Sequence, residues 1–169
     1  VLSIVDIAKD KNIEIIFNTE EEEIITAIDE EKIVRVILIL LSNSIKFSKE
    51  KGDICVEMRR EDEEVVIKVT DNGIGINEDM KEKIFDKFKR VQSVSNLNVD
   101  HEGSGLGLYI AKGFIELHNG SISVVSEVEK GSTFIITIPI VIIKNDLHNI
   151  NHMDEDELNR IIKIELSDL

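Results

Sequence analysis

The sequence predicts an α+β protein in which helices pack on one face of a mixed, mostly antiparallel sheet. Two segments, 29–47 and 106–117, carry hydrophobic side chains at the helical spacing of three and four residues. Two pairs of segments, 54–58 with 65–69 and 121–126 with 133–139, alternate hydrophobic and polar residues, which is typical of antiparallel hairpins. Because 169 residues without an internal repeat suit one domain with a sizeable core, we expect a two-layer α/β sandwich.

The first half of the chain contains the longest predicted helix. Residues 1–9 are expected to be the end of a helix, and 12–18 and 22–28 to form strands. The helix over 29–47 begins at Asp29, a favourable N-cap residue. The hairpin of 54–58 and 65–69 then places Asp71 at the end of its second strand. The buried stripe of the helix consists of Ile33, Val36, Ile37, Leu40, Leu41 and Ser44.

The second half alternates helical and strand patterns. A helical period covers 77–89, and the Ser- and Asn-rich segment 91–102 predicts a flexible loop of a length that is usually functional. A helix over 106–117 precedes a last hairpin that turns at Lys130-Gly131. Residues 154–169 predict an amphipathic helix that packs on its own domain or docks a partner. We therefore expect a linker-helix end at 1–10, a domain over 11–140 and an acidic tail over 141–169.

Composition excludes several classes of function. The net charge of −14, with no basic stripe to offset it, argues against nucleic-acid binding. Cys55 is the single cysteine, which excludes internal disulfides and cysteine-based zinc sites. No segment has the length of a membrane span and no signal peptide is visible, so we expect a cytoplasmic domain without direct membrane contact. Because the chain starts without methionine and in mid-pattern, we interpret it as a fragment of a longer protein, which leaves open a membrane anchor elsewhere in that protein.

Two glycine-rich runs are the strongest functional signal. The run Asp71-Asn72-Gly73-Ile74-Gly75-Ile76 offers a carboxylate that can accept a hydrogen bond from an exocyclic amine such as N6 of adenine. Its glycines allow close approach of the backbone because they lack a Cβ atom. The second run, Gly103-Ser104-Gly105-Leu106-Gly107-Leu108, opens a predicted helix, whose free N–H groups can meet phosphates. Together the runs predict a nucleotide site that lacks a P-loop.

The end of the helix over 29–47 supplies further candidate ligands. Asn43 and Lys46 are three residues apart and can point toward one place. The asparagine offers a neutral oxygen to Mg²⁺, and the lysine offers a point charge to phosphate. Phe47 could stack on a base. The alternative, that Asn43 and Lys46 are ordinary solvated residues, loses because the glycine runs already call for a cation ligand and a phosphate partner.

These motifs resemble the conserved boxes of sensor histidine kinases. Residues 41–48, Leu-Ser-Asn-Ser-Ile-Lys-Phe-Ser, resemble the N box, and 71–76 the G1 box. Residues 83–88 resemble the F box, 103–108 the G2 box, and 131–134, Gly-Ser-Thr-Phe, the glycine motif that follows it. The resemblance covers roughly 10–140 in the family's order. It implies a Bergerat-type ATP-binding fold, shared with type II topoisomerases, heat-shock chaperones and mismatch-repair ATPases.

The resemblance also implies roles for individual residues. Asn43 would ligate Mg²⁺, Lys46 would approach the phosphates, and Asp71 would bind the adenine amino group. The implied cofactors are ATP and Mg²⁺, and the implied partners are a histidine-bearing dimerisation domain and the receiver domain of a response regulator. The other implied nucleotide-binding residues are Phe47, Gly73, Gly75, Ile76, the lid arginine Arg90, Gly103, Ser104, Gly105, Leu106, Gly107, Leu108 and Thr133, the last through the adenine water network.

Ile39 departs from the family pattern. Most N boxes carry an asparagine four residues before the Mg²⁺-binding asparagine, and ATP-hydrolysing relatives carry a glutamate there. Because Ile39 and Asn43 share a helix face, a polar group near the metal or an attacking water is missing. Isoleucine cannot act as a general base, so efficient free ATP hydrolysis is not expected. A simpler interpretation is that Ile39 only extends the apolar core.

The histidines leave three functional hypotheses. None of His101, His118, His148 and His152 fits a phosphoacceptor on a dimerisation helix. The first hypothesis is therefore a kinase catalytic domain that phosphorylates a histidine elsewhere. The second is an ATPase or nucleotide switch of the same fold, against which Ile39 counts. The third is a degenerate, nonenzymatic nucleotide-binding module, against which the intact glycine motifs count.

Overall fold

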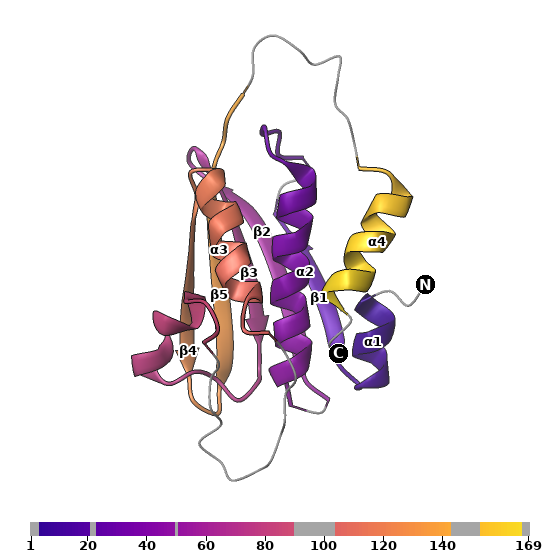
Figure 1. Cartoon of the computed structure of the whole chain (residues 1–169), viewed down its shortest axis with the longest axis vertical. Helices are drawn as coiled ribbons and strands as arrows, with labels where there is room; N and C mark the ends of the chain where they lie inside the picture. Colours follow the sequence, from indigo (N-terminus) through magenta and orange to yellow (C-terminus); the bar gives the residue numbers. More distant parts are fainter. Residues whose placement is uncertain (1–3, 21–22, 50, 90–103, 143–152, 167–169) are drawn as a thin grey trace.

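A computed structural model shows a two-layer fold with one five-stranded sheet. It describes residues 4–20, 23–49, 51–89, 104–142 and 153–166. The strand order is β1-β2-β3-β5-β4, and the helices lie together on one face of the sheet (Figure 1). Only β1 and β2 run parallel; the β2–β3, β3–β5 and β4–β5 pairs are antiparallel. The predicted α+β sandwich with a mixed, mostly antiparallel sheet is confirmed.

The parallel pair follows from a helical crossover. Strand β1 (Glu14–Thr19) leads through helix α2 (Glu30–Phe47) to β2 (Asp53–Glu61), which is the connection that two parallel neighbours require. Two hairpins complete the sheet. In the first, β2 pairs with β3 (Glu64–Asp71); in the second, β4 (Ser121–Glu127) pairs with β5 (Gly131–Pro139). Helix α1 (Ile4–Asp10) precedes β1, and α3 (Gly107–Leu117) precedes β4.

Helix α2 is the central helix of the layer. The side chain of Asp29 accepts a hydrogen bond from the backbone N–H of Lys32 at 3.1 Å and caps the first turn, as predicted. Val36 and Leu40 of α2 are fully buried. They face the inner side of the sheet, where the strands contribute Ile54, Val69, Phe134 and Ile136. Alternation along the strands thus puts one face of the sheet in the core.

Two predicted elements are wrong. Residues 23–28 form no strand; this extended segment is tied to the end of β5 by the bond from Ala27 N–H to the carbonyl of Val141 at 2.8 Å. The predicted helix 77–89 forms instead as two 3₁₀ turns, Glu78–Met80 and Lys83–Phe85. The second turn ends because Asp86 has extended backbone (ψ 152°). The predicted loop 91–102 lies outside the described residues.

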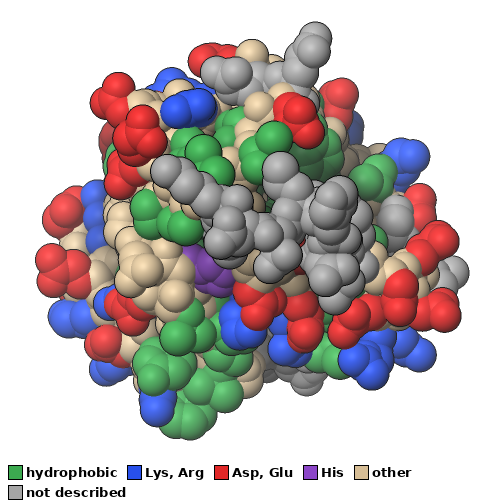
Figure 2. All heavy atoms as spheres, turned by 90° about the horizontal axis from the view of Figure 1, so that it is seen from above, with side chains coloured by type: hydrophobic (Ala, Val, Ile, Leu, Met, Phe, Trp, Pro, Cys, Tyr) green, Lys and Arg blue, Asp and Glu red, His purple; other side chains and the backbone are tan. Residues whose placement is uncertain are grey.

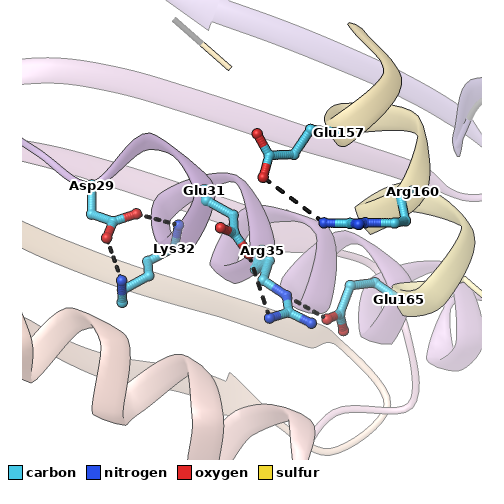
Figure 3. A network of polar contacts seen from close by, with 7 residues as sticks. All are labelled: Asp29, Glu31, Lys32, Arg35, Glu157, Arg160 and Glu165. Atoms are coloured by element: carbon cyan, nitrogen blue, oxygen red, sulfur yellow. Dashed lines mark hydrogen bonds and ion pairs between the residues drawn. The ribbon is translucent and has the colours of Figure 1, made fainter. Parts of the chain in front are cut away.

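Helix α4 (Glu155–Glu165) packs on α2, on the flank away from α3 (Figure 1). It forms within the predicted range 154–169 and buries Ile161 and, just beyond its end, Leu166. Arg35 of α2 lies between Glu31 of its own helix and Glu165 of α4, which it contacts at 3.2 Å (Figure 3). Between the two interpretations left open by the sequence, the structure shows the helix on its own domain.

Candidate functional site

Six of the predicted site residues converge on a cavity at one end of the molecule. It lies where β3 ends, β5 begins, α2 ends and α3 begins. These four chain segments come from both hairpins and both central helices, so the cavity exists only in the complete fold. The residues that line it are Asn43, Phe47, Asp71, Ile74, Gly75, Ile76, Ile84, Leu108, Ser132 and Phe134.

Asp71 is the one charged side chain among the residues that line the cavity. It is 7% exposed, and its Oδ1 accepts hydrogen bonds from the backbone N–H of Gly73 at 2.8 Å and of Ser132 at 3.3 Å. Its Oδ2 lies 3.5 Å from the hydroxyl of Ser44, at the limit of a hydrogen bond. Oδ1 is therefore held by the protein, and Oδ2 keeps acceptor capacity for a ligand amine.

Burial raises the pKa of the Asp71 carboxyl above its ordinary value. The hydrogen bonds from Gly73, Ser132 and Ser44 oppose this shift by stabilising the charged form. Because the donors surround Oδ1 and a buried hydroxyl faces Oδ2, the carboxylate has a fixed orientation. A group held in this way suits recognition of a ligand donor, and shifted carboxyl groups in cavities are typical of functional sites.

Ser132 is a site residue that sequence reasoning missed. It is 7% exposed, lines the cavity and donates its backbone N–H to Asp71. The implied role of Thr133 is not supported by its position, because its hydroxyl lies 3.1 Å from that of Thr70, on the opposite face of the sheet. The signal was available: Phe134, Ile136 and Ile138 alternate as inward residues, and Ser132 has the same parity.

The glycines of the 71–76 run meet protein backbone rather than open space. A Cβ atom on Gly73 would lie 2.3 Å from the carbonyl oxygen of Phe47. Gly75 has a φ of +70°, and its Cβ would lie 2.1 Å from the carbonyl oxygen of Glu127. The bond from Ile76 N–H to the hydroxyl of Ser126, at 2.9 Å, fixes the same run to β4. These glycines therefore let α2, the run and the β4–β5 turn pack tightly around Asp71.

Helix α2 brings Asn43 and Phe47 to the cavity but not Lys46. Asn43 and Phe47 line it, and all three side chains are half-buried. Lys46 lies on the same last turn of α2 but does not line the cavity, and its contact with phosphate stays a prediction. Among the described residues, no group of three His, Cys, Asp or Glu side chains could hold a metal ion.

The second glycine run reaches the cavity through its last residues. Leu108 lines the cavity, and the carbonyl of Gly105, whose φ is +68°, accepts a hydrogen bond from Phe88 N–H at 3.0 Å. No side chain caps the start of α3 at Leu106, although Leu106 N–H contacts the hydroxyl of Ser104 at 3.3 Å. This helix start faces the same end of the molecule as Asn43. Arg90 and Gly103 lie outside the described residues.

Ile39 packs between α2 and α3. It is 4% exposed, and a Cβ atom on Gly107 would lie 3.2 Å from its Cγ2. This position is one turn of α2 before Asn43, as the sequence predicted. The structure agrees with the simpler interpretation, in which Ile39 extends the apolar core.

Comparison with known proteins identifies the family. Residues 28–142 match the model of the "Histidine kinase-, DNA gyrase B-, and HSP90-like ATPase" family, and this match includes every element that lines the cavity. The chain belongs to this family. Its fold is the nucleotide-binding ATPase fold that the motifs implied, and its similar curated proteins are histidine kinases. The recognition made from the five boxes is confirmed.

The similar proteins include full-length kinases and isolated catalytic domains. The chain is 35% identical over 136 residues to the sensor histidine kinase WalK of Bacillus subtilis (strain 168), covering 79% of the chain and 22% of WalK. It resembles the catalytic domain of the histidine kinase ThkA, at 29% identity with a TM-score of 0.69 over 80% of the chain and 85% of that domain. ThkA is also known in complex with the response regulator TrrA. The chain also resembles full-length ShkA, whose structure is known in complex with AMPPNP. That match covers 83% of the chain and 28% of ShkA, at 26% identity and a TM-score of 0.71.

The chain thus spans less than a quarter of WalK. Helix α4 lies beyond the family match, which ends at residue 142. Within the described residues, no helix has the combination of length and hydropathy that is needed to cross a membrane.

Proposed function

We propose that this chain is the ATP-binding catalytic domain of a sensor histidine kinase, and that it transfers the γ-phosphoryl group of ATP to a histidine on a separate dimerisation domain. The observation that carries the proposal is the buried Asp71 carboxylate, whose Oδ1 is held by two backbone N–H groups while Oδ2 stays available in the cavity. The amino group of adenine is a donor that matches Oδ2, whereas guanine would present a carbonyl there. The family membership and the ShkA complex with AMPPNP support this assignment.

The remaining parts of the nucleotide fit the surrounding residues in order. Adenine would lie between Phe47 and Leu108, against Ser132 and Asp71. The phosphates would extend past Asn43 toward Lys46 and the start of α3, where uncapped backbone N–H groups favour anions. Arg90 and Gly103, outside the described residues, stay candidates for the phosphate end. The role of the chain in transfer would be positioning and electrostatic stabilisation.

The residues present fit a Mg²⁺ ion that arrives with ATP. Asn43 supplies a neutral oxygen at the cavity, and the nucleotide phosphates would supply other ligands. When bound, the ion neutralises charge on the phosphate oxygens. Since the described residues offer no independent cluster of acidic or imidazole ligands, Mg²⁺ should bind measurably only together with nucleotide.

The partners follow from the same proposal. The histidine-bearing dimerisation domain would precede the chain, with residues 1–10 as the end of its linker helix, 11–140 as the catalytic domain and 141–169 as a tail. The phosphoryl group would then pass to the receiver domain of a response regulator; the ThkA complex with TrrA supports such a partner. We place the domain in the cytoplasm, where ATP is available.

Phosphoryl transfer with labelled ATP tests the proposal. The chain alone should hydrolyse ATP very slowly and should not keep a stable phosphoryl group. With the dimerisation domain of its parent protein, or of WalK as a substitute, the label should appear on the acceptor histidine. Rapid hydrolysis by the chain alone would indicate an ATPase instead. Binding of ATP without transfer to any acceptor would indicate the nonenzymatic module.

Ile39 bears on the choice between the kinase and the nonenzymatic module. If the side chain at this position acts on the metal side, Ile39 removes a polar group there and favours the module; if Ile39 only extends the core, it favours neither. We expect Ile39→Asn to raise the rate of transfer to the acceptor by restoring that group beside Asn43. The same change should lower the free energy of unfolding by about 1–3 kcal/mol, because the buried amide replaces apolar packing against Gly107. Ile39→Val is the matched control and should leave the transfer rate unchanged. A transfer rate that is unchanged in folded Ile39→Asn would refute the metal-side role of this position.

A further inference from the structure

His118 connects helices α2 and α3 at the end of the molecule that lies opposite the cavity. Its Nε2 lies 2.9 Å from the backbone N–H of Asp29, the N-cap residue of α2. Its Nδ1 lies 2.7 Å from the carbonyl oxygen of Phe114 in the last turn of α3. The two contacts define the imidazole: Nδ1–H donates to Phe114, and Nε2 accepts from Asp29. One half-buried side chain therefore satisfies a terminal carbonyl of α3 and a terminal N–H of α2.

The contacts of α3 with α2 show what this bond constrains. Near the cavity, Gly107 approaches Ile39 so closely that a Cβ atom would lie 3.2 Å away. At the other end, His118 reaches Asp29, so the two helices are antiparallel and α3 contacts α2 at both of its own ends. Between these ends, Ala111 and Ile115 of α3 are completely buried. Apolar packing of this kind is non-directional, whereas the His118 bond fixes one rotation and one register.

Charged side chains at the start of α2 lie near His118. The Asp29 carboxylate faces it from α2 and is itself paired with Lys32 (Figure 3). Figure 2 looks onto this end of the molecule, where Asp and Glu side chains lie on both sides of the view with Lys and Arg side chains among them. The Asp29–Lys32 pair is local to the first turn of α2 and does not reach α3. His118 therefore joins the end of α3 to the start of α2 through one hydrogen bond to each.

We infer that His118 is a positioning residue for the nucleotide site: it anchors α3 to the start of α2 and thereby sets where the 104–108 turn stands beside the cavity. The inference rests on the proposed function. Helix α3 has only eleven residues, so a rotation about its far end displaces its first turn directly. That turn carries Leu108, which lines the cavity, and the uncapped N–H groups that would meet phosphates. Loss of the anchor should therefore weaken the phosphate contacts more than the adenine contacts, because of the four residues proposed to contact adenine only Leu108 comes from this turn.

Three substitutions at His118 separate its two bonds. His118→Gln places an amide oxygen near the position of Nε2 and can keep the bond to Asp29 N–H. His118→Asn places its amide near Nδ1 and can keep only the bond to Phe114. His118→Phe keeps the ring and loses both bonds. Asn and Gln are matched in polarity, so their comparison isolates the bond between the helices even if the Phe variant fails to fold.

Calorimetric titration with ATP and with adenosine tests the inference. Wild type and His118→Gln should bind ATP with similar affinity. His118→Asn should bind ATP about 3- to 10-fold more weakly, the loss expected for one hydrogen bond, while its affinity for adenosine should change less than about twofold. Equal ATP affinity of the Asn and Gln variants, or an equal loss for adenosine and ATP, would overturn the positioning role. Failure of the wild type to bind either ligand would instead overturn the proposed function.

Discussion

The two flanks of helix α2 differ in how they are built. Toward α3, the contact depends on close backbone approach at Gly107, on buried aliphatic side chains and on the His118 bond. Toward α4, it depends on two buried side chains, on the Arg35–Glu165 ion pair and on the bond from Met153 N–H to Glu30. The α3 flank lies inside the family match of 28–142, and α4 lies outside it. We propose that the α3 flank serves nucleotide binding and that the α4 flank serves stability.

The largest loss of stability should come from adding a side-chain atom at the tight backbone contact of Gly75, near Asp71. Gly75→Ala would place a methyl group 2.1 Å from a carbonyl oxygen at a φ of +70°. The left-handed φ alone should cost about 1–3 kcal/mol of unfolding free energy, and the clash should add to it and weaken ATP binding. Gly113→Ala is the control, because a Cβ there meets no atom within 4 Å. In the interior of α3 it should stabilise by about 0.5–1 kcal/mol. Chemical denaturation measures both, and equal effects would contradict the packing described here.

The α4 flank should affect stability without affecting the nucleotide. Ile161→Ala removes a side chain that is 3% exposed and should lower the free energy of unfolding by about 2–4 kcal/mol. Ile164→Ala, on the same helix but 54% exposed, should change it by less than about 0.5 kcal/mol. Neither substitution should alter the affinity for ATP. A loss of ATP affinity in folded Ile161→Ala would show that the two flanks are coupled.

The Asp71 carboxylate should matter for binding and not for folding. Asp71→Asn should weaken ATP binding by about 1–3 kcal/mol, since the adenine amine loses its charged acceptor. Since burial raises the folded-state pKa of Asp71, its contribution to stability is present at low pH and is lost as pH rises through that pKa. Removing the charge should therefore not lower stability at pH 7. Asp53→Asn, on the exposed start of β2, is the matched control and should change neither quantity.

The cavity could be predicted from the sequence because a carboxylate, an amide and an aromatic residue that line it stand in recognisable motifs. Asp71, Asn43 and Phe47 come to one place as predicted, and the helices and hairpins follow from periodicity. The segment 77–89 failed because its helical period is also compatible with two short turns, and local backbone geometry at Asp86 decided between them. His118 carries no sequence signal, because its partner Asp29 lies 89 residues away and the bond is to a backbone N–H.

The alternation of the strand explains why Ser132, rather than the predicted Thr133, lines the cavity. Both residues are polar and both are in the Gly-Ser-Thr-Phe motif, so residue type did not distinguish them. The alternation along β5 distinguishes them, because every second residue from Ile138 back to Ser132 faces the core, and Thr133 faces the other side. The sequence contained this information, but only once the strand was aligned with the face that it buries.

Parallel titration of the unmodified chain with ATP and GTP tests the central claim most directly. In the proposed site, Asp71 is a fixed, buried carboxylate whose Oδ2 accepts a hydrogen bond from an amine of the base. ATP and ADP should therefore bind, and GTP should bind more weakly, because the carbonyl of guanine would face the Asp71 carboxylate. Equal affinities for ATP and GTP would contradict the assignment of Asp71, and with it the placement of the nucleotide in this cavity.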